Sequence, residues 1–220
     1  MIGLTGNIAS GKSLVGQTLA RLGAEHGAEM IHGDVMHIDA DRLSRQVMAP
    51  GTDVWQAIVD TFGPDIIAAD GSLDRAKLGE IVFSDAAALA RLEAIVHPAV
   101  IALTKERIAQ ASSQNSPVVV VEAIKLIESG MVRQLCDVLW VVTAPREVRL
   151  ERLVRQRGMD RATAQQRIDA QPPEAQKVAH ADVVIDNSGT VEETVRQVER
   201  AWRELERSRN RVFEAKKPGF

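Results

Sequence analysis

Short runs of apolar residues recur along the chain, and segments of helical periodicity separate them. Several of these runs are continuous rather than alternating, which is typical of strands buried on both faces of a parallel sheet. The runs lie at residues 1–5, 35–38, 117–121, 138–142 and 183–185. Because strands and helices alternate, the pattern predicts an α/β fold with a five-stranded parallel sheet and helices on both faces.

Two segments carry helical periodicity without a strand, and they interrupt this alternation. The first, residues 41–116, is broken by Pro-Gly, Gly-Pro and Asp-Gly pairs that separate short helices. The second, residues 149–181, is rich in arginine, and Pro172 with Pro173 ends a helix within it. We therefore predict a single unit with two helical insertions. Its core comprises residues 1–40, 117–148 and 182–213.

Charge and composition narrow the possible functions. The 220 residues carry a net charge of −3, so the chain offers no overall attraction to nucleic acid. Cys136 is the single cysteine, which excludes an internal disulfide. No run of 18 apolar residues is present, and the N-terminus lacks the pattern of a signal peptide. We expect a cytoplasmic monomer or weak homo-oligomer that binds neither nucleic acid nor membranes.

Residues 6–13 read Gly-Asn-Ile-Ala-Ser-Gly-Lys-Ser, which is the spacing of a phosphate-binding P-loop. The motif follows an apolar run and opens a helix, as such a loop requires. Its glycines let successive backbone N–H groups point toward phosphates, and the helix N-terminus adds partial positive charge. Lys12 is expected to reach the β and γ phosphates of ATP, and the Ser13 hydroxyl to bind Mg²⁺. The predicted nucleotide-binding residues are Gly6, Asn7, Ala9, Ser10, Gly11, Lys12, Ser13 and Leu14.

A P-loop predicts a nucleoside triphosphate but no particular reaction. The Asn-Lys-x-Asp element that specifies guanine in GTPases is absent. Small-molecule kinases place a helical acceptor-binding insertion after the second strand and an arginine-rich lid later, and this chain shows both. We therefore assign residues 41–116 to acceptor binding and residues 149–181 to a lid. A nucleoside monophosphate kinase and an ATP-dependent switch are the alternatives.

Several acids and one histidine are candidates for the acceptor and metal side. Asp39 and Asp41 end the second predicted strand, where ligands gather in open parallel sheets. Either carboxylate can orient an acceptor hydroxyl and take its proton, or one of them only caps the next helix. Glu122 ends the third strand and either holds a metal-bound water near the substrate or simply stops the strand. His97 precedes Pro98 and either contacts a phosphate or caps a kinked helix.

Arginines dominate the predicted lid. Arg149, Arg152 and Arg155 recur every three residues, close enough to the helical period to lie along one side of a helix. Guanidinium groups stabilise the charge on a transferring phosphoryl group when a lid closes, so Arg152 and Arg155 are candidate catalytic residues. The alternative is a solvated face paired with nearby acids. The nucleotide base is expected to lie against the turn after the last strand, formed by Asn187, Ser188 and Gly189.

Five motifs in order resemble those of the dephospho-CoA kinase family and span nearly the whole chain. They are Leu-Thr-Gly with Gly-Lys-Ser at 4–13, Ile-Asp-Ala-Asp at 38–41, Gly-x-Leu-x-Arg at 71–75, Leu-x-x-x-x-His-Pro at 92–98, and Ala-Asp-Val-Val-Ile-Asp-Asn-Ser-Gly at 181–189. The resemblance implies transfer of the ATP γ-phosphoryl group to the ribose 3′-hydroxyl of dephospho-CoA, the last step of coenzyme A synthesis. It also implies that Asp41 orients that hydroxyl.

The chain departs from the family pattern in several places. Leu14 follows the P-loop serine where the family commonly has threonine, and the family's Pro-Leu-Leu-Phe-Glu after the third strand is replaced at residues 122–128. Residues near 25–36 are extra. In the lid, Arg152 matches a family arginine, while the second family arginine falls beside Gln156. Either Arg155 or Arg157 takes its place.

Overall fold

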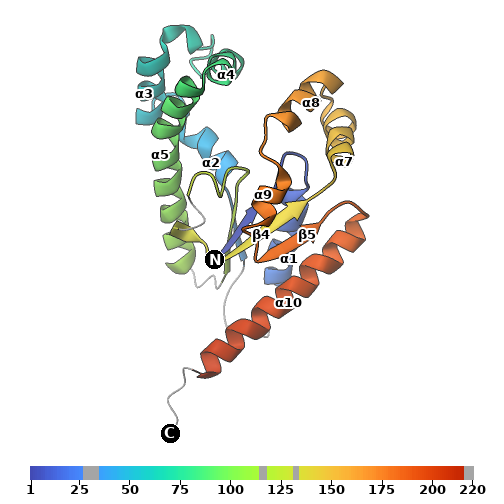
Figure 1. The fold of residues 1–220 in the computed structure, drawn as a ribbon. Helices are drawn as coiled ribbons and strands as arrows, with labels where there is room; N and C mark the ends of the chain where they lie inside the picture. The colour runs from blue at the N-terminus through green and yellow to red at the C-terminus, as the bar shows by residue number, and fades with distance from the viewer. Residues whose placement is uncertain (27–34, 114–117, 131–133, 216–220) are drawn as a thin grey trace. The chain divides into compact units, whose positions relative to one another are not determined.

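The computed structural model describes residues 1–26, 35–113, 118–130 and 134–215, and all statements below concern these residues (Figure 1). The strands are β1 (Ile2–Thr5), β2 (Val35–Asp39), β3 (Val118–Glu122), β4 (Val138–Thr143) and β5 (Val183–Asp186). They form one sheet in the order β2-β3-β1-β4-β5, and the pairs β1–β3, β1–β4 and β4–β5 are parallel. The predicted five-stranded parallel α/β fold is confirmed.

The chain divides into two compact units. The first comprises Met1–His37 with Ala111–Phe220, and the second comprises Ile38–Gln110. The extra residues noted near 25–36 lie mainly outside the described part of the chain.

Strands β1, β3 and β4 are buried on both faces, which explains why they read as continuous apolar runs. Along β1, Ile2 and Leu4 enter a core that includes residues of α1 (Lys12–His26) and α10 (Val191–Ala215). Gly3 faces the opposite way, where an added Cβ would lie 3.0 Å from Leu126 Cδ2. Helices α1 and α10 thus cover one face, and the segment after β3 packs against the other.

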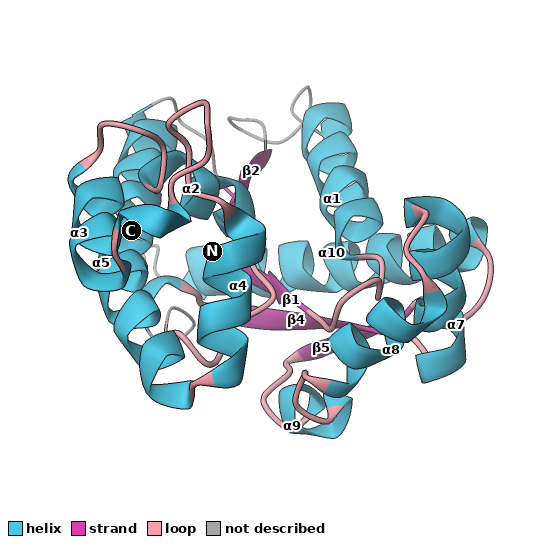
Figure 2. Cartoon of the chain, turned by 90° about the horizontal axis from the view of Figure 1, so that it is seen from above, coloured by secondary structure: helices cyan, strands magenta, loops and turns pink. Residues whose placement is uncertain are grey.

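Four short helical elements separate β4 from β5. They are α7 (Arg146–Glu151), the π-helical turn η2 (Arg152–Gln156), α8 (Arg161–Asp169) and α9 (Glu174–Val178). Helices α7 and α8 pack together with η2 (Figure 2). Their small apolar core includes Leu153 and Ile168 and also takes in Ala9 of the P-loop. Helix α8 ends at Asp169, shortly before the Pro172-Pro173 pair, as predicted.

The second unit is built from helices. They are α2 (Ala40–Val47), α3 (Asp53–Phe62), the 3₁₀ turn η1 (Pro64–Ile66), α4 (Arg75–Ser84) and α5 (Ala86–Ser113). Side-chain oxygens of Asp39, Thr52 and Asp74 accept backbone N–H groups at the starts of α2, α3 and α4, so these polar residues set where the helices begin. The helical character predicted for residues 41–116 is confirmed for most of the described residues; the connection between η1 and α4 instead holds an isolated antiparallel bridge between Ile67 and Leu73.

Helix α5 is long and apolar. Among the described residues it is the one helix that has the length and composition to cross a membrane, over Ala86–Gln110. One such helix is weak evidence for a membrane span, because core helices of soluble proteins share this length and composition. The charged residues Arg91 and Glu93 also lie within the stretch. The predicted absence of a membrane-spanning segment therefore stays a prediction.

Candidate active site

The P-loop lies between β1 and the start of α1 at Lys12, as the motif predicts. Gly6 has a φ of +156°, and a Cβ there would lie 2.3 Å from the Val142 carbonyl oxygen. Gly11 has a φ of +98°, and a Cβ there would lie 1.8 Å from Asn187 Nδ2. Glycine is therefore required at both positions for two reasons: a side chain would collide with a neighbouring strand or turn, and the positive φ angles disfavour other residues.

Lys12 is buried within the loop that precedes it. Its Nζ donates a hydrogen bond to the Gly6 carbonyl at 3.2 Å, so the ammonium group lies beside the first residue of the P-loop. Next to it, the exposed Ser13 side chain faces a cavity of about 260 Å³. The cavity is lined by Ala9, Gly11, Lys12, Ser13, Leu14, Arg152, Gln156, Arg157, Asn187, Gly189 and Val191.

Arg152, at the start of η2 in the predicted lid, bonds to the P-loop. Its Nη1 donates to the carbonyls of Ala9 and Ser10 at 3.2 and 3.3 Å, and its Nη2 donates to the Asn187 carbonyl at 2.8 Å. Burial lowers the pKa of its guanidinium group from the ordinary value. The planar fork thus ties η2, the P-loop and the turn after β5 together, with three backbone carbonyls as its acceptors.

Asn187 is almost fully buried beneath the P-loop. Its Nδ2 donates to the Ser10 carbonyl at 2.8 Å, and its Oδ1 accepts from Thr194 Oγ1 at 2.8 Å. The side-chain amide therefore anchors the P-loop backbone, which is a different partner from the predicted nucleotide base. The base contact stays a prediction for the backbone of Ser188 and Gly189.

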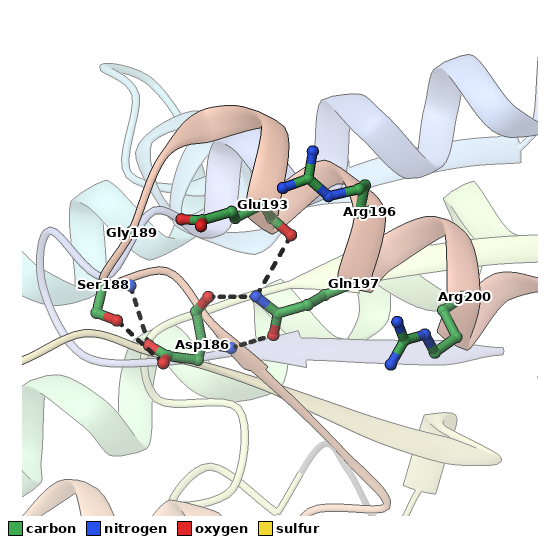
Figure 3. A pocket seen from close by; sticks show the side chains of 7 residues that line it. All are labelled: Asp186, Ser188, Gly189, Glu193, Arg196, Gln197 and Arg200. Carbon is green, nitrogen blue, oxygen red and sulfur yellow. Dashed lines mark hydrogen bonds between the residues drawn. The ribbon is translucent and has the colours of Figure 1, made fainter.

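A second cavity, of about 400 Å³, is lined by residues of this turn and of α10 (Figure 3). Gln197 of α10 brackets Asp186 at the end of β5: its Oε1 accepts from the Asp186 N–H at 3.0 Å, and its Nε2 donates to the Asp186 carbonyl at 2.7 Å (Figure 3). The Asp186 carboxylate in turn accepts from Ser188. These bonds hold the turn, and Gly189 lines both cavities.

The three arginines that recur along residues 149–155 differ in environment. Arg149 is buried and its Nε donates to the Ala144 carbonyl at 3.0 Å, so it supports the fold. Arg155 is 77% exposed and lies 3.7 Å from Glu151, which matches the solvated alternative. Arg157, one of the two alternatives for the second family arginine, lines the P-loop cavity. Residues 152–156 form a π-helical turn instead of a regular α-helix, which the sequence did not predict.

Two contacts on the P-loop were not predicted from the sequence. The Ile8 N–H donates to Gln171 Oε1 at 2.8 Å, and Asn7 Nδ2 donates to the Pro172 carbonyl at 3.2 Å. Both partners lie between α8 and α9, far from the loop in sequence. The double proline marks the end of α8, but no local pattern indicates which side chains meet the P-loop.

Glu122 ends β3 and is buried, level with Leu4 in the parallel register. The loop that follows is tied to β1, because Thr5 Oγ1 donates to the carbonyls of Ala123 at 2.8 Å and Ile124 at 3.1 Å. Thr5 directly precedes the P-loop. Glu122 is therefore held at the strand end beside the start of the loop, and its metal or substrate role stays a prediction.

The second unit carries the remaining candidates. Asp39 is the N-cap of α2, and its Oδ1 accepts the Arg42 N–H at 3.0 Å, so the capping alternative holds for this acid. Asp41 lies in the first turn of α2, and its side chain is outside the described residues. His97 is half-buried inside α5, which continues through Pro98. The alternative that His97 caps a kinked helix is therefore wrong, and its phosphate contact stays a prediction.

The sheet, the P-loop and the arginine-bearing helices together define a P-loop nucleotide-binding protein of the small-kinase class. The family model described as dephospho-CoA kinase matches residues 1–193. A dephospho-CoA kinase of Geobacter metallireducens is 46% identical over 204 residues, covering 93% of this chain and 96% of that protein. The chain therefore belongs to the dephospho-CoA kinase family.

Two solved structures share this fold. The crystal structure of TT1252 from Thermus thermophilus is 32% identical with a TM-score of 0.75, covering 93% of this chain and 96% of that one. A dephospho-CoA kinase from Campylobacter jejuni has a TM-score of 0.65, covering 94% of this chain and 98% of that one. At 24% identity, the second likeness supports the fold alone.

Proposed function

We propose that this protein transfers the γ-phosphoryl group of ATP to the ribose 3′-hydroxyl of dephospho-CoA, yielding CoA and ADP. Family membership over residues 1–193 supports the reaction class. The observation that carries the assignment to this chain's residues is the cavity beside the P-loop, which Lys12, Ser13, Arg152 and Arg157 all line. A cationic, partly enclosed pocket at a P-loop suits the phosphates of a nucleoside triphosphate.

The residues of the first unit have distinct proposed roles. Lys12 neutralises the β and γ phosphates, and Arg157 supplies a second positive charge from the lid side of the cavity. Arg152 contributes mainly by holding the P-loop carbonyls, since its Nη1 and Nη2 are both engaged with them and with Asn187. The predicted catalytic role of Arg155 receives no support from its exposed position.

Mg²⁺ fits the oxygen donors at this site. Ser13 supplies a hydroxyl at the cavity, and Glu122 supplies a carboxylate at the end of β3. Hydroxyl and carboxylate oxygens suit this hard cation, which keeps several waters when it binds. We propose that Ser13 contacts the ion directly and Glu122 through water. The ion would neutralise charge on the phosphates.

We propose that the second unit, residues 38–110, binds dephospho-CoA and that Asp41 orients its 3′-hydroxyl and accepts the proton. A nucleoside monophosphate kinase transfers to a phosphate and needs no such base. An acceptor screen with ATP and Mg²⁺ separates the two. Consumption of ATP that depends on dephospho-CoA, with a 3′-phosphorylated product in mass spectrometry, supports the proposal. Equal turnover with nucleoside monophosphates and none with dephospho-CoA contradicts it.

The two aspartates offer a matched pair of substitutions. Asp41→Asn should lower kcat by roughly 10²- to 10⁴-fold with ATP affinity retained, since only the base is lost. Asp39→Asn keeps the helix cap, because asparagine caps as well as aspartate, and should change kcat less than about tenfold. The reverse pattern would assign the base to Asp39.

The location and assembly of the enzyme follow from this proposal. We infer that it acts in the cytoplasm as a monomer or weak homo-oligomer, with ATP and dephospho-CoA as its small-molecule partners. Membrane association through α5 would contradict this. It is tested by fractionation of cells and by sedimentation of the purified protein.

A further inference from the structure

The segment between α8 and α9 lies against one end of the P-loop. Gln171 Oε1 accepts the Ile8 N–H at 2.8 Å, and the Pro172 carbonyl accepts from Asn7 Nδ2 at 3.2 Å. These two adjacent bonds, here called the P-loop clasp, join residues 7–8 to residues 171–172. Asn7 is only 2% exposed, and its Oδ1 has no hydrogen-bond partner within the described residues. Breaking the clasp would leave both ends of a buried amide without partners, which disfavours opening.

The clasp lies at the terminal-phosphate end of the loop. Lys12 Nζ, the group expected at the β and γ phosphates, is 3.2 Å from the carbonyl of Gly6, the residue just before Asn7. The cavity beside the loop is lined instead by Ala9 and by residues 11–14. Asn7 and Ile8 do not line it, so removing the clasp should leave the lining residues, Lys12 and Ser13 included, in place.

The backbone of the clasp is pre-set by its sequence. Gln171 precedes a proline, which restricts it to extended conformations, and neither Pro172 nor Pro173 has an N–H that could continue α8. The other end of the segment is also fixed, by Lys177 of α9. Its buried Nζ donates to the Ile124 carbonyl at 2.7 Å and to Glu128 Oε1 at 2.6 Å. Residues 171–177 are thus held to the sheet unit at both ends.

We propose that Gln171 is a positioning residue that fastens the lid's return segment to the P-loop, so that this segment shields the transferring phosphoryl group from water. The catalytic part of this inference rests on the proposed function. With η2 tied to the P-loop by Arg152 and residues 171–177 held to the sheet unit, lid movement is confined to the residues between these two attachments. Without the clasp, water gains access and attacks the γ-phosphorus, releasing ADP and inorganic phosphate in place of transfer to the acceptor.

Three variants test the clasp. In Gln171→Ala, the Ile8 amide should exchange its hydrogen at least about tenfold faster in nucleotide-free protein, because its acceptor is gone. ADP released without matching 3′-phosphorylated product should rise by roughly tenfold, while the Kd for ADP changes less than about twofold. Gln165→Ala, an exposed glutamine of α8, is the control and should match the wild type in all three measurements.

Gln171→Glu separates positioning from simple structural support. Its carboxylate can still accept the Ile8 N–H, so protection of that amide should persist. Its negative charge beside the terminal phosphate should weaken ATP binding by roughly tenfold relative to ADP. If the Ile8 amide exchanges at the wild-type rate in Gln171→Ala, the proposed bond to Gln171 is wrong. If that amide exchanges faster but ADP release still matches the 3′-phosphorylated product, the shielding role is wrong. If the wild type fails to phosphorylate dephospho-CoA, the proposed function is wrong. The role of the clasp is still tested in that case, by Ile8 amide exchange and by ATP hydrolysis without an acceptor.

Discussion

Gly11→Ala should destabilise the protein mainly through its collision with Asn187. The new Cβ would lie 1.8 Å from Asn187 Nδ2 and 3.1 Å from its Cγ, so the asparagine side chain has to leave its site. Leaving breaks the bonds to the Ser10 carbonyl and from Thr194 Oγ1, both 2.8 Å long. Two such bonds contribute about 2 kcal/mol to the free energy of unfolding.

The conformational cost of the same substitution is separate. At a φ of +98°, alanine pays an additional cost of about 1 to 2 kcal/mol. The total loss should therefore be roughly 3 to 4 kcal/mol. Asn187→Ala alone should cost about 2 to 3 kcal/mol, because the Ser10 carbonyl keeps Arg152 and the Thr194 hydroxyl keeps the Thr190 carbonyl as partners.

A double-mutant cycle isolates the collision. In an Asn187→Ala background the next neighbour of the new Cβ is Arg152 Nη1 at 3.7 Å, an ordinary contact, so Gly11→Ala should then cost only the conformational part. The coupling between the two sites should be about 2 kcal/mol. Gly158→Ala calibrates the conformational cost, because that glycine has a φ of +63° and no atom within 4 Å of its added Cβ.

The free energies are measured by urea unfolding in a Trp55→Phe background. The fluorescence then reports Trp140 and Trp202, which are both buried in the core of the sheet unit. An equal cost of Gly11→Ala with and without the Asn187 side chain would refute the reasoning. It would mean that backbone conformation alone accounts for the requirement for glycine.

Two further predictions concern the lid and the single cysteine. Arg152→Lys should weaken ATP binding by about tenfold in calorimetry, because an ammonium group cannot span three carbonyls as the guanidinium fork does. Arg155→Ala should change ATP binding less than about twofold, because Arg155 is exposed. Similar losses of ATP affinity in both variants would contradict the different roles. Burial raises the pKa of the Cys136 thiol from 9.0 to about 11, so the unfolded state releases this proton at lower pH than the folded state. The thiol should therefore not affect the free energy of unfolding below pH 9. Between pH 9 and 11 the free energy of unfolding should fall more steeply in the wild type than in Cys136→Ala. Equal pH dependence in the two proteins would show that the thiol is not shielded.

Most of the fold could be predicted because its signals are local. Strands buried on both faces must be apolar at successive positions, so β1, β3 and β4 stand out as continuous runs. The P-loop is likewise a contiguous motif between a strand and a helix. The sequence did not show at which residue α2 begins, so it left open whether Asp39 caps that helix. In the structure α2 begins at Ala40, and Asp39 is its cap.

The partners of the site residues could not be predicted in the same way. Arg152, Asn187 and Gln171 each meet the P-loop across more than a hundred residues of sequence. The spacing of the arginines left open which of them acts on the phosphates, and in the structure Arg152 bonds to the P-loop whereas Arg155 is 77% exposed. Residues 152–156 form a π-helical turn, where a spacing argument that assumes a regular α-helix does not apply.

By itself, then, the sequence determined the α/β class, the P-loop with Lys12 and Ser13, and the resemblance to one kinase family, because periodicity and contiguous motifs are properties of the chain alone. The tertiary structure decided that Arg152 bonds to the loop, that the Asn187 amide supports its backbone, and that Gln171 accepts the Ile8 N–H. Hydrogen bonds between segments distant in sequence depend on how those segments pack, and no local pattern records that packing.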